Sequence, residues 1–143
     1  MELLNAIPLI GPILGSVLPF LLVLGVGVFV HEYGHSIVGR WCGIHAETFS
    51  IGFGQQLFGV VDKRGTRWRL AALPLGGYVK FLGDADASSS GVDEEAMAHL
   101  NAAQRAHSFP GAALWRRAVT VGAGPVANFL LSISIFAASA LYL

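Results

Sequence analysis

The chain carries an H-E-x-x-H motif at His31-Glu32-Tyr33-Gly34-His35. Residues four apart on an α-helix lie on the same face, so His31 and His35 can present their imidazoles to one Zn²⁺. Glu32 is offset by one position and does not compete for the ion. Its carboxylate can take a proton from the attacking water and return it to the leaving amine. The spacing therefore predicts a zinc hydrolase site with two histidine ligands and Glu32 as the catalytic acid and base.

The motif ends a long apolar segment, and residues 3–30 have no charged side chain. Hydrophobic residues make up 54% of the chain and charged residues 13%, which is typical of membrane proteins. Ionisable residues are costly inside a bilayer, so those found there are functional by default. A span needs about 20 apolar residues, and two segments satisfy this: Leu3–Val30, continuing to Trp41, and Ala118–Leu143. The alternative is a pair of buried helices in a soluble core, where helices this long and uncharged are rare.

The basic residues indicate an orientation in the membrane. All nine Lys and Arg lie between Arg40 and Arg117, so the positive-inside rule predicts that residues 40–117 are cytoplasmic and both termini lie on the far side. His35 is five residues inward of Arg40 and His31 is nine, which is about 7–14 Å below the membrane surface. The lipid bilayer is therefore an expected partner, and no nucleic-acid partner is expected.

The expected fold class is a mainly α membrane protein. It has two transmembrane helices joined by a cytoplasmic-side β-hairpin or re-entrant β-loop and a flexible linker. Composition divides the chain into four segments: a first transmembrane helix with the motif (1–43), a β-rich membrane-associated loop (44–82), a flexible cytoplasmic linker (83–112) and a second transmembrane helix (113–143).

Finer predictions concern the first three segments. The first helix is predicted from about Pro19 to Cys42, with Gly43 as its stop and irregular structure over 1–18. Residues 62–65 predict a hairpin turn. The apolar stretch 73–81 fits either a re-entrant or interfacial segment or an ordinary soluble hairpin. A short surface helix is expected over 93–105.

Two histidines do not complete a catalytic zinc site, which usually has three protein ligands and one open position. The remaining nearby candidates are His45, Asp62, His99 and His107, and none of them is well placed within a span. The sequence therefore does not identify the third ligand.

Four motifs in order resemble the site-2 protease family of intramembrane zinc metalloproteases, and the bacterial regulator of sigma-E protease type most closely. They are His31-Glu32-Tyr33-Gly34-His35, Phe49-Ser50-Ile51-Gly52-Phe53-Gly54, Pro74-Leu75-Gly76-Gly77-Tyr78-Val79-Lys80 and Ala123-Gly124-Pro125-Val126-Ala127-Asn128-Phe129. The resemblance covers most of the chain, and the 83–112 segment matches nothing in particular.

The resemblance implies His31 and His35 as zinc ligands and Glu32 as the catalytic residue. It implies that Gly76 and Gly77 belong to a membrane-associated β-loop that receives an unwound substrate, for which strand pairing is a plausible route. Asn128 matches a family position on the second helix. It fits either a hydrogen bond to substrate backbone or one to a neighbouring helix, and both remain open.

The implied activity is cleavage of transmembrane segments of other membrane proteins, such as clipped anti-sigma factors and signal-peptide remnants, in the bacterial inner membrane. Family members continue into a periplasmic PDZ region and further spans, one of which carries an Asp ligand in a Leu-Asp-Gly motif that this chain lacks. We therefore expect the chain to correspond to an N-terminal portion with little or no proteolysis by itself. The alternatives are a non-catalytic membrane scaffold and a membrane metal-binding protein that completes its zinc site by oligomerising.

Overall fold

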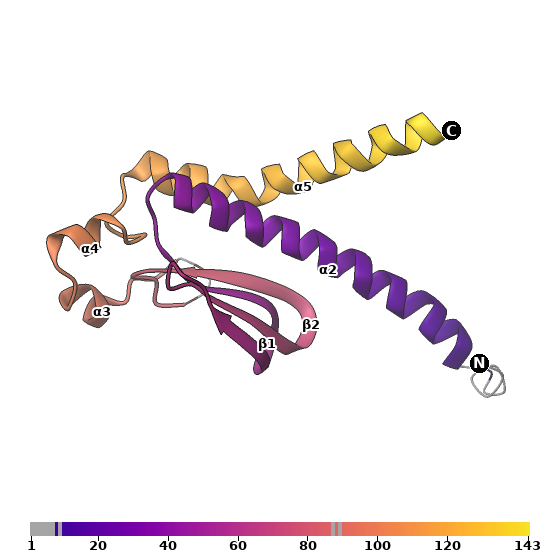
Figure 1. Ribbon diagram of the computed structural model, residues 1–143, viewed down its shortest axis with the longest axis horizontal. Coiled ribbons are helices and arrows are strands. Elements are labelled where there is room, and N and C mark those ends of the chain that lie inside the picture. The colour runs from indigo at the N-terminus through magenta and orange to yellow at the C-terminus, as the bar shows by residue number, and fades with distance from the viewer. Residues whose placement is uncertain (1–7, 9, 87, 89) are drawn as a thin grey trace.

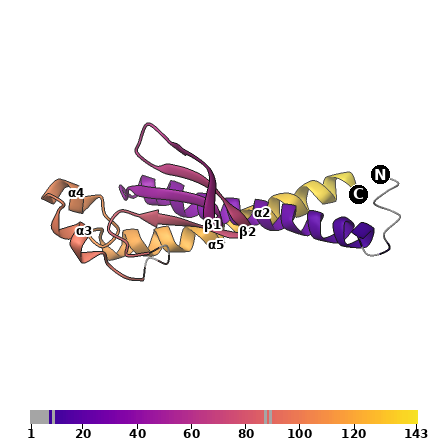
Figure 2. The same cartoon turned by 90° about the horizontal axis from the view of Figure 1, so that it is seen from below.

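The computed structural model describes residues 8, 10–86, 88 and 90–143. Two long helices, a bent β-hairpin and two short helices follow one another along the chain (Figure 1). Their bounds are α2 (Ile10–Trp41), β1 (Ala46–Val61), β2 (Arg67–Phe81), α3 (Glu94–Ala98), α4 (Ala102–Ala106) and α5 (Leu114–Tyr142). The end of α2 packs against the start of α5, and the hairpin lies along α2. The start of α2 and the end of α5 both lie at the opposite end of the molecule from α3 and α4 (Figure 2), where the two helices have diverged from each other (Figure 1).

Helices α2 and α5 are both long and apolar enough to cross a membrane. With 32 residues, α2 is about 48 Å long, more than the roughly 30 Å of hydrocarbon in a bilayer. None of the most apolar stretch of α2 is buried inside the protein, and only 11% of that of α5 is. Exposure on this scale differs from that of helices in the core of a soluble domain, so the two helices agree with the predicted membrane spans by length, composition and exposure.

The start of α2 differs from the prediction, because the helix begins at Ile10 and residues 10–18 are helical. The rest of the predicted irregular segment, residues 1–7 and 9, lies outside the described residues. Pro12 falls in the first turn, where a backbone N–H has no partner within the helix. Pro19 lies inside the helix and has no N–H to donate to the carbonyl of Gly15, four residues earlier. A Cβ added at Gly15 would have nothing within 4 Å. At the other end, Gly43 has φ +79°, which confirms it as the stop.

The predicted hairpin turn is present at residues 62–65. Asp62 Oδ1 accepts hydrogen bonds from the backbone N–H of Arg64 (2.8 Å) and of Thr66 (3.0 Å). Gly65 supplies the positive φ, +82°, that the turn requires. The apolar stretch 73–81 is the second half of β2 and pairs with β1, so in this structure it is sheet and not a separate loop.

Both strands bend, and the sheet folds back on itself. Ile51 pairs with both Leu70 and Gly77, so the first part of β1 lies between the two halves of β2. Gly52 makes the bend possible, because its φ is +88° and an added Cβ would lie 2.8 Å from the carbonyl oxygen of Leu73. No other residue type tolerates both the conformation and the close approach.

The segment predicted as a flexible linker, 83–112, is structured where it is described. It forms α3 and α4, and Asn101 caps α4 in a reciprocal capping box with Gln104. The ring of Phe109 stacks on Phe81 with centroids 5.7 Å apart. Phe109 and Ala112 of this segment belong to the buried core, whose other members are Ile44, Ala46, Phe49, Val79 and Phe81. The surface helix predicted over 93–105 is two short helices, and residues 87 and 89 of the predicted linker lie outside the described part.

Candidate metal centre and active site

The two histidines of the motif meet on the face of α2 that packs against α5. Their Nε2 atoms are 3.1 Å apart, and their rings are nearly perpendicular at 83°. Two nitrogens that each lie about 2.1 Å from one tetrahedral zinc ion are about 3.4 Å apart. The imidazoles of His31 and His35 are thus close to the separation that a shared ion requires, which fits the predicted pair of ligands.

His35 is held in the tautomer that metal binding needs. Its Nδ1 lies 2.9 Å from the backbone carbonyl oxygen of Thr120 on α5, so Nδ1–H donates and Nε2 keeps its lone pair. Thr120 is fully buried, and its hydroxyl donates to the carbonyl of Arg116 at 2.8 Å. The orienting group is a backbone carbonyl, which no side-chain motif reveals.

His31 contacts the amide of Asn128, which also lies on α5. Asn128 Nδ2 is 3.2 Å from Nδ1 of His31, while Asn128 Oδ1 is buried without a partner in the described part of the chain. A neutral imidazole that binds metal through Nε2 carries its proton on Nδ1, which then needs an acceptor. If the Asn128 amide is turned by 180°, Oδ1 takes the place of Nδ2 beside His31 Nδ1. The oxygen then provides that acceptor and is itself paired. Of the two predicted contacts of Asn128, the structure contains the one to the neighbouring helix.

Glycines allow the two helices to approach at the histidine pair. A Cβ added at Gly124 would overlap His35 Nε2 and lie 2.9 Å from His31 Cε1. A Cβ at Gly34 would lie 2.6 Å from the carbonyl oxygen of Ala123. Gly124 lies in one of the four motifs but the sequence predicts no role for it, and Thr120 lies outside them. The signal that points to Gly124 is a small residue on each of two packed helices.

A cavity of about 460 Å³ lies beside the histidine pair, between α2, α5 and the hairpin. Five of the six predicted site residues line it: His31, Glu32, Gly76, Gly77 and Asn128. The sixth, His35, is joined to the cavity through its contact with His31. The remaining lining is apolar except for a glycine, and consists of Val23, Leu24, Gly27, Val28, Phe53 and Leu75.

The two predicted glycines lie where the hairpin meets α2. A Cβ at Gly77 would be 3.0 Å from Val28 and 3.6 Å from Cγ of Glu32, and a Cβ at Gly76 would be 2.6 Å from the ring of Phe53. The hairpin backbone therefore comes next to the carboxylate that the motif predicts as catalytic.

Among the described residues, no three His, Cys, Asp or Glu side chains are grouped closely enough to hold a metal ion. His45, Asp62 and His107 line a different cavity at the end of α2, so these three candidates do not complete the site. The structure thus brings together the two predicted ligands, His31 and His35, and no third candidate joins them among the described residues.

Residues 19–143 match the family described as Peptidase family M50. The chain belongs to this family of metallopeptidases, which confirms the resemblance to site-2 proteases. It is 58% identical over 127 residues to a protein of Agrobacterium fabrum named "Putative zinc metalloprotease Atu1380". It is 44% identical over 124 residues to "Metalloprotease MmpA" of Caulobacter vibrioides.

These alignments cover 89% and 82% of the chain but only 33% and 31% of the two relatives. A relative from Mesorhizobium japonicum, also named as a zinc metalloprotease, is 56% identical over 86% of the chain and 34% of its own length. The chain thus spans about a third of the length of the curated relatives that it matches.

Proposed function

We propose that this chain forms part of an intramembrane zinc metalloprotease that cleaves transmembrane segments of membrane proteins. The observation that carries the proposal is the histidine pair, whose Nε2 atoms are 3.1 Å apart beside a cavity lined by Glu32. Family membership and the names of the relatives support zinc as the metal.

The residues of this chain divide the chemistry among them. Zinc bound at such a site polarises the scissile carbonyl and makes water a better nucleophile. His31 and His35 would hold the ion through Nε2. The Thr120 carbonyl fixes the proton of the His35 ring on Nδ1, and the Asn128 amide, once turned by 180°, would do the same for His31. Glu32 lines the same cavity as His31 and takes the proton from water at its carboxylate, then returns it to the leaving amine.

The hairpin supplies the surface for the substrate. A helical transmembrane segment must unwind before its peptide bonds can be attacked, and its freed N–H and C=O groups then need partners. The second half of β2, which contains Gly76 and Gly77, is paired only with β1 in the described part of the chain, so one edge is open beside the cavity. Strand addition there would satisfy the substrate backbone next to Glu32. Clipped anti-sigma factors and signal-peptide remnants are the proposed substrates.

Helices α2 and α5 are the proposed spans of a multi-pass protein in the bacterial inner membrane. In this arrangement residues 40–117 are cytoplasmic and both ends of the chain are periplasmic. The exposed apolar surfaces of both helices support this, as does the position of the start of α2 and the end of α5 on the side of the molecule away from α3 and α4 (Figure 1). The grouping of all nine basic residues between Arg40 and Arg117 supports the orientation.

The third zinc ligand is proposed to be an aspartate from sequence beyond this chain, as the family resemblance implies. By itself the chain would then bind zinc weakly and cleave little. The pair of histidines without a third described ligand also suits a second candidate, a metal-binding membrane protein whose site is shared between two copies. Zinc stoichiometry separates the two, since a shared site holds one ion per two chains.

Cleavage of a model transmembrane substrate by the full-length enzyme tests the proposal, with Glu32→Gln as the variant. Glutamine keeps the size of the side chain and cannot accept the proton, so we expect cleavage to fall by about 100-fold or more while zinc content is unchanged. Cleavage by Glu32→Gln at the rate of the parent would overturn the role of Glu32.

A further inference from the structure

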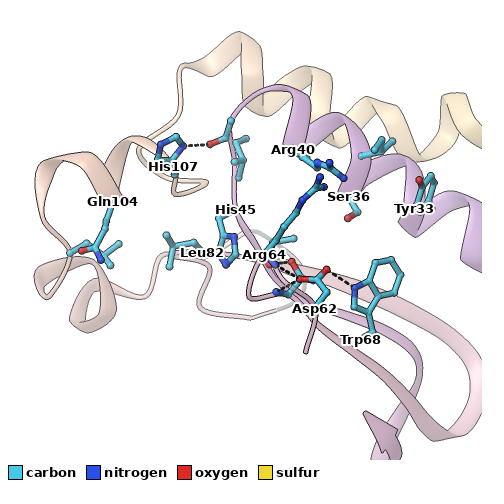
Figure 3. A pocket seen from close by; sticks show the side chains of 16 residues that line it. Tyr33, Ser36, Arg40, His45, Asp62, Arg64, Trp68, Leu82, Gln104 and His107 are labelled. Atoms are coloured by element: carbon cyan, nitrogen blue, oxygen red, sulfur yellow. Dashed lines mark hydrogen bonds between the residues drawn. The ribbon is translucent and has the colours of Figure 1, made fainter. Parts of the chain in front are cut away.

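A second and larger cavity, of about 860 Å³, lies at the C-terminal end of α2 (Figure 3). It is bounded by α2, by the turn between β1 and β2, and by α4, and it shares no lining residue with the cavity beside Glu32. Neither the proposed protease chemistry nor the third zinc ligand uses it.

Cationic side chains from two separate elements meet in this cavity. Arg40 comes from the last turn of α2 and Arg64 from the hairpin turn, and Figure 3 shows the Arg64 side chain extending towards Arg40. In the described part of the chain neither guanidinium has a hydrogen bond or an ion pair; the ion pair found there joins Lys80 to Glu47. The ring of His45 lies in the same cavity without a hydrogen bond to a described residue.

The one carboxylate in the cavity does not neutralise these cations through a direct contact. Asp62 Oδ1 accepts from the N–H groups of Arg64 and Thr66, and Oδ2 accepts from Nε1 of Trp68 at 2.8 Å. Both oxygens are thus used to hold the turn and to fix the indole. Two converging guanidinium groups without a paired anion repel each other, and an anion between them would remove that cost.

The chemistry of the cavity fits a phosphate group. Guanidinium forks bind phosphate oxygens in a bidentate manner and are less strongly hydrated than ammonium groups. The same cavity has apolar walls at Ile37, Ile44 and Leu82. Such walls suit an amphiphile with an anionic head.

We infer that Arg40 and Arg64 form a binding site for a phosphate group, either that of an anionic phospholipid or inorganic phosphate. The phosphate site is inferred from the two arginines alone, whereas a lipid as the source of the phosphate depends on the proposed membrane position of α2. Bound phosphate joins the hairpin turn to the end of α2. It thereby fixes the sheet that carries Gly76 and Gly77 relative to the helix that carries Glu32.

The test uses the purified chain in detergent and native mass spectrometry of bound ligands. The probes are a short-chain phosphatidylglycerol, a diacylglycerol with the same acyl chains, and inorganic phosphate. The variants are Arg40→Gln and Arg64→Gln, and the control is Lys63→Gln, which removes a charge from the same turn without lining the cavity. Both arginines are exposed, so neither substitution removes core packing.

We expect phosphatidylglycerol to bind at least about tenfold more weakly to each arginine variant, which is the effect of losing one charged hydrogen bond. Lys63→Gln should bind within about twofold of the parent, and diacylglycerol should not bind. If inorganic phosphate binds with the same dependence on both arginines, the free ion is sufficient; if only the lipid does, the lipid headgroup is the source. Both results support the site.

Three results would overturn the site: arginine variants that bind as well as the parent, a Lys63→Gln variant that loses as much, or a parent that binds neither probe. Zinc titration of the same samples keeps this test separate from the proposed protease function. The arginine variants should retain the zinc affinity of the parent, because the histidine pair lies in a different cavity. A failed phosphate site with intact zinc binding leaves the protease proposal standing.

Discussion

Asn128 on α5 lies 3.2 Å from the Nδ1 atom of His31 on α2, across 97 positions of sequence. This contact connects the second long helix to a predicted zinc ligand, and it explains why an amide side chain lies in the uncharged part of α5. The amide oxygen, buried without a partner among the described residues, is the acceptor that a metal-binding His31 needs.

Replacing Asn128 by alanine should weaken zinc binding by about 10-fold or more, because the proton on Nδ1 of His31 loses its acceptor. Asn128→Asp should retain zinc affinity, since a carboxylate accepts from the same Nδ1–H. Zinc titration in detergent measures both variants. Ser134→Ala is the control, because among the described residues the Ser134 hydroxyl bonds only to the carbonyl of Leu130 within α5. Equal zinc affinity in Asn128→Ala and the parent would contradict the orienting role.

Replacing Gly124 by alanine should displace the histidine pair. The new Cβ would overlap Nε2 of His35, so either the ring or the helix must move. We expect destabilisation of about 1–3 kcal/mol, seen as a lower midpoint in thermal unfolding, and a loss of zinc affinity. Gly122→Ala on the same helix has nothing within 4 Å and should change neither quantity by much. If the two variants behave alike, the close approach of α5 to the pair is wrong.

Gly52→Ala should loosen the bend in the sheet more than Gly54→Ala does. Both glycines have positive φ, +88° and +82°, so each alanine is strained by about 1–2 kcal/mol. Only at Gly52 would the new Cβ also approach backbone, at 2.8 Å from the oxygen of Leu73; at Gly54 it meets the Leu73 side chain at 3.8 Å. Amide hydrogen exchange across β1 and β2 measures the difference. Faster exchange in Gly54→Ala than in Gly52→Ala would go against the folded-back register.

The sequence alone predicts the arrangement of side chains that belong to one local pattern. The spacing of His31 and His35 predicts their meeting because both lie on one helix, and the turn at 62–65 carries its own signal in Asp62 and Gly65. Helices α2 and α5 are also predicted from the sequence, because the length of a segment and its lack of charge are local properties.

The rest depends on contacts between distant parts of the chain. The carbonyl of Thr120 orients His35 through the backbone, which leaves no trace in residue type. Phe109 and Ala112 lie in a segment whose apolar residues follow no helical or strand periodicity. Their packing on Phe81 and its neighbours, which makes 83–112 part of the structured protein, follows only from the folded arrangement. The early start of α2 was missed because Pro12 falls in the first turn, where proline is tolerated.

X-ray absorption spectroscopy of the chain loaded with zinc tests the central claim most directly. A shared ion between His31 and His35 predicts two imidazole ligands with zinc–nitrogen distances of about 2.0–2.1 Å. It also predicts that the double variant His31→Ala, His35→Ala loses both the imidazole signal and the bound metal. Zinc retained by the double variant, or a spectrum without imidazole scattering in the parent, would contradict the account.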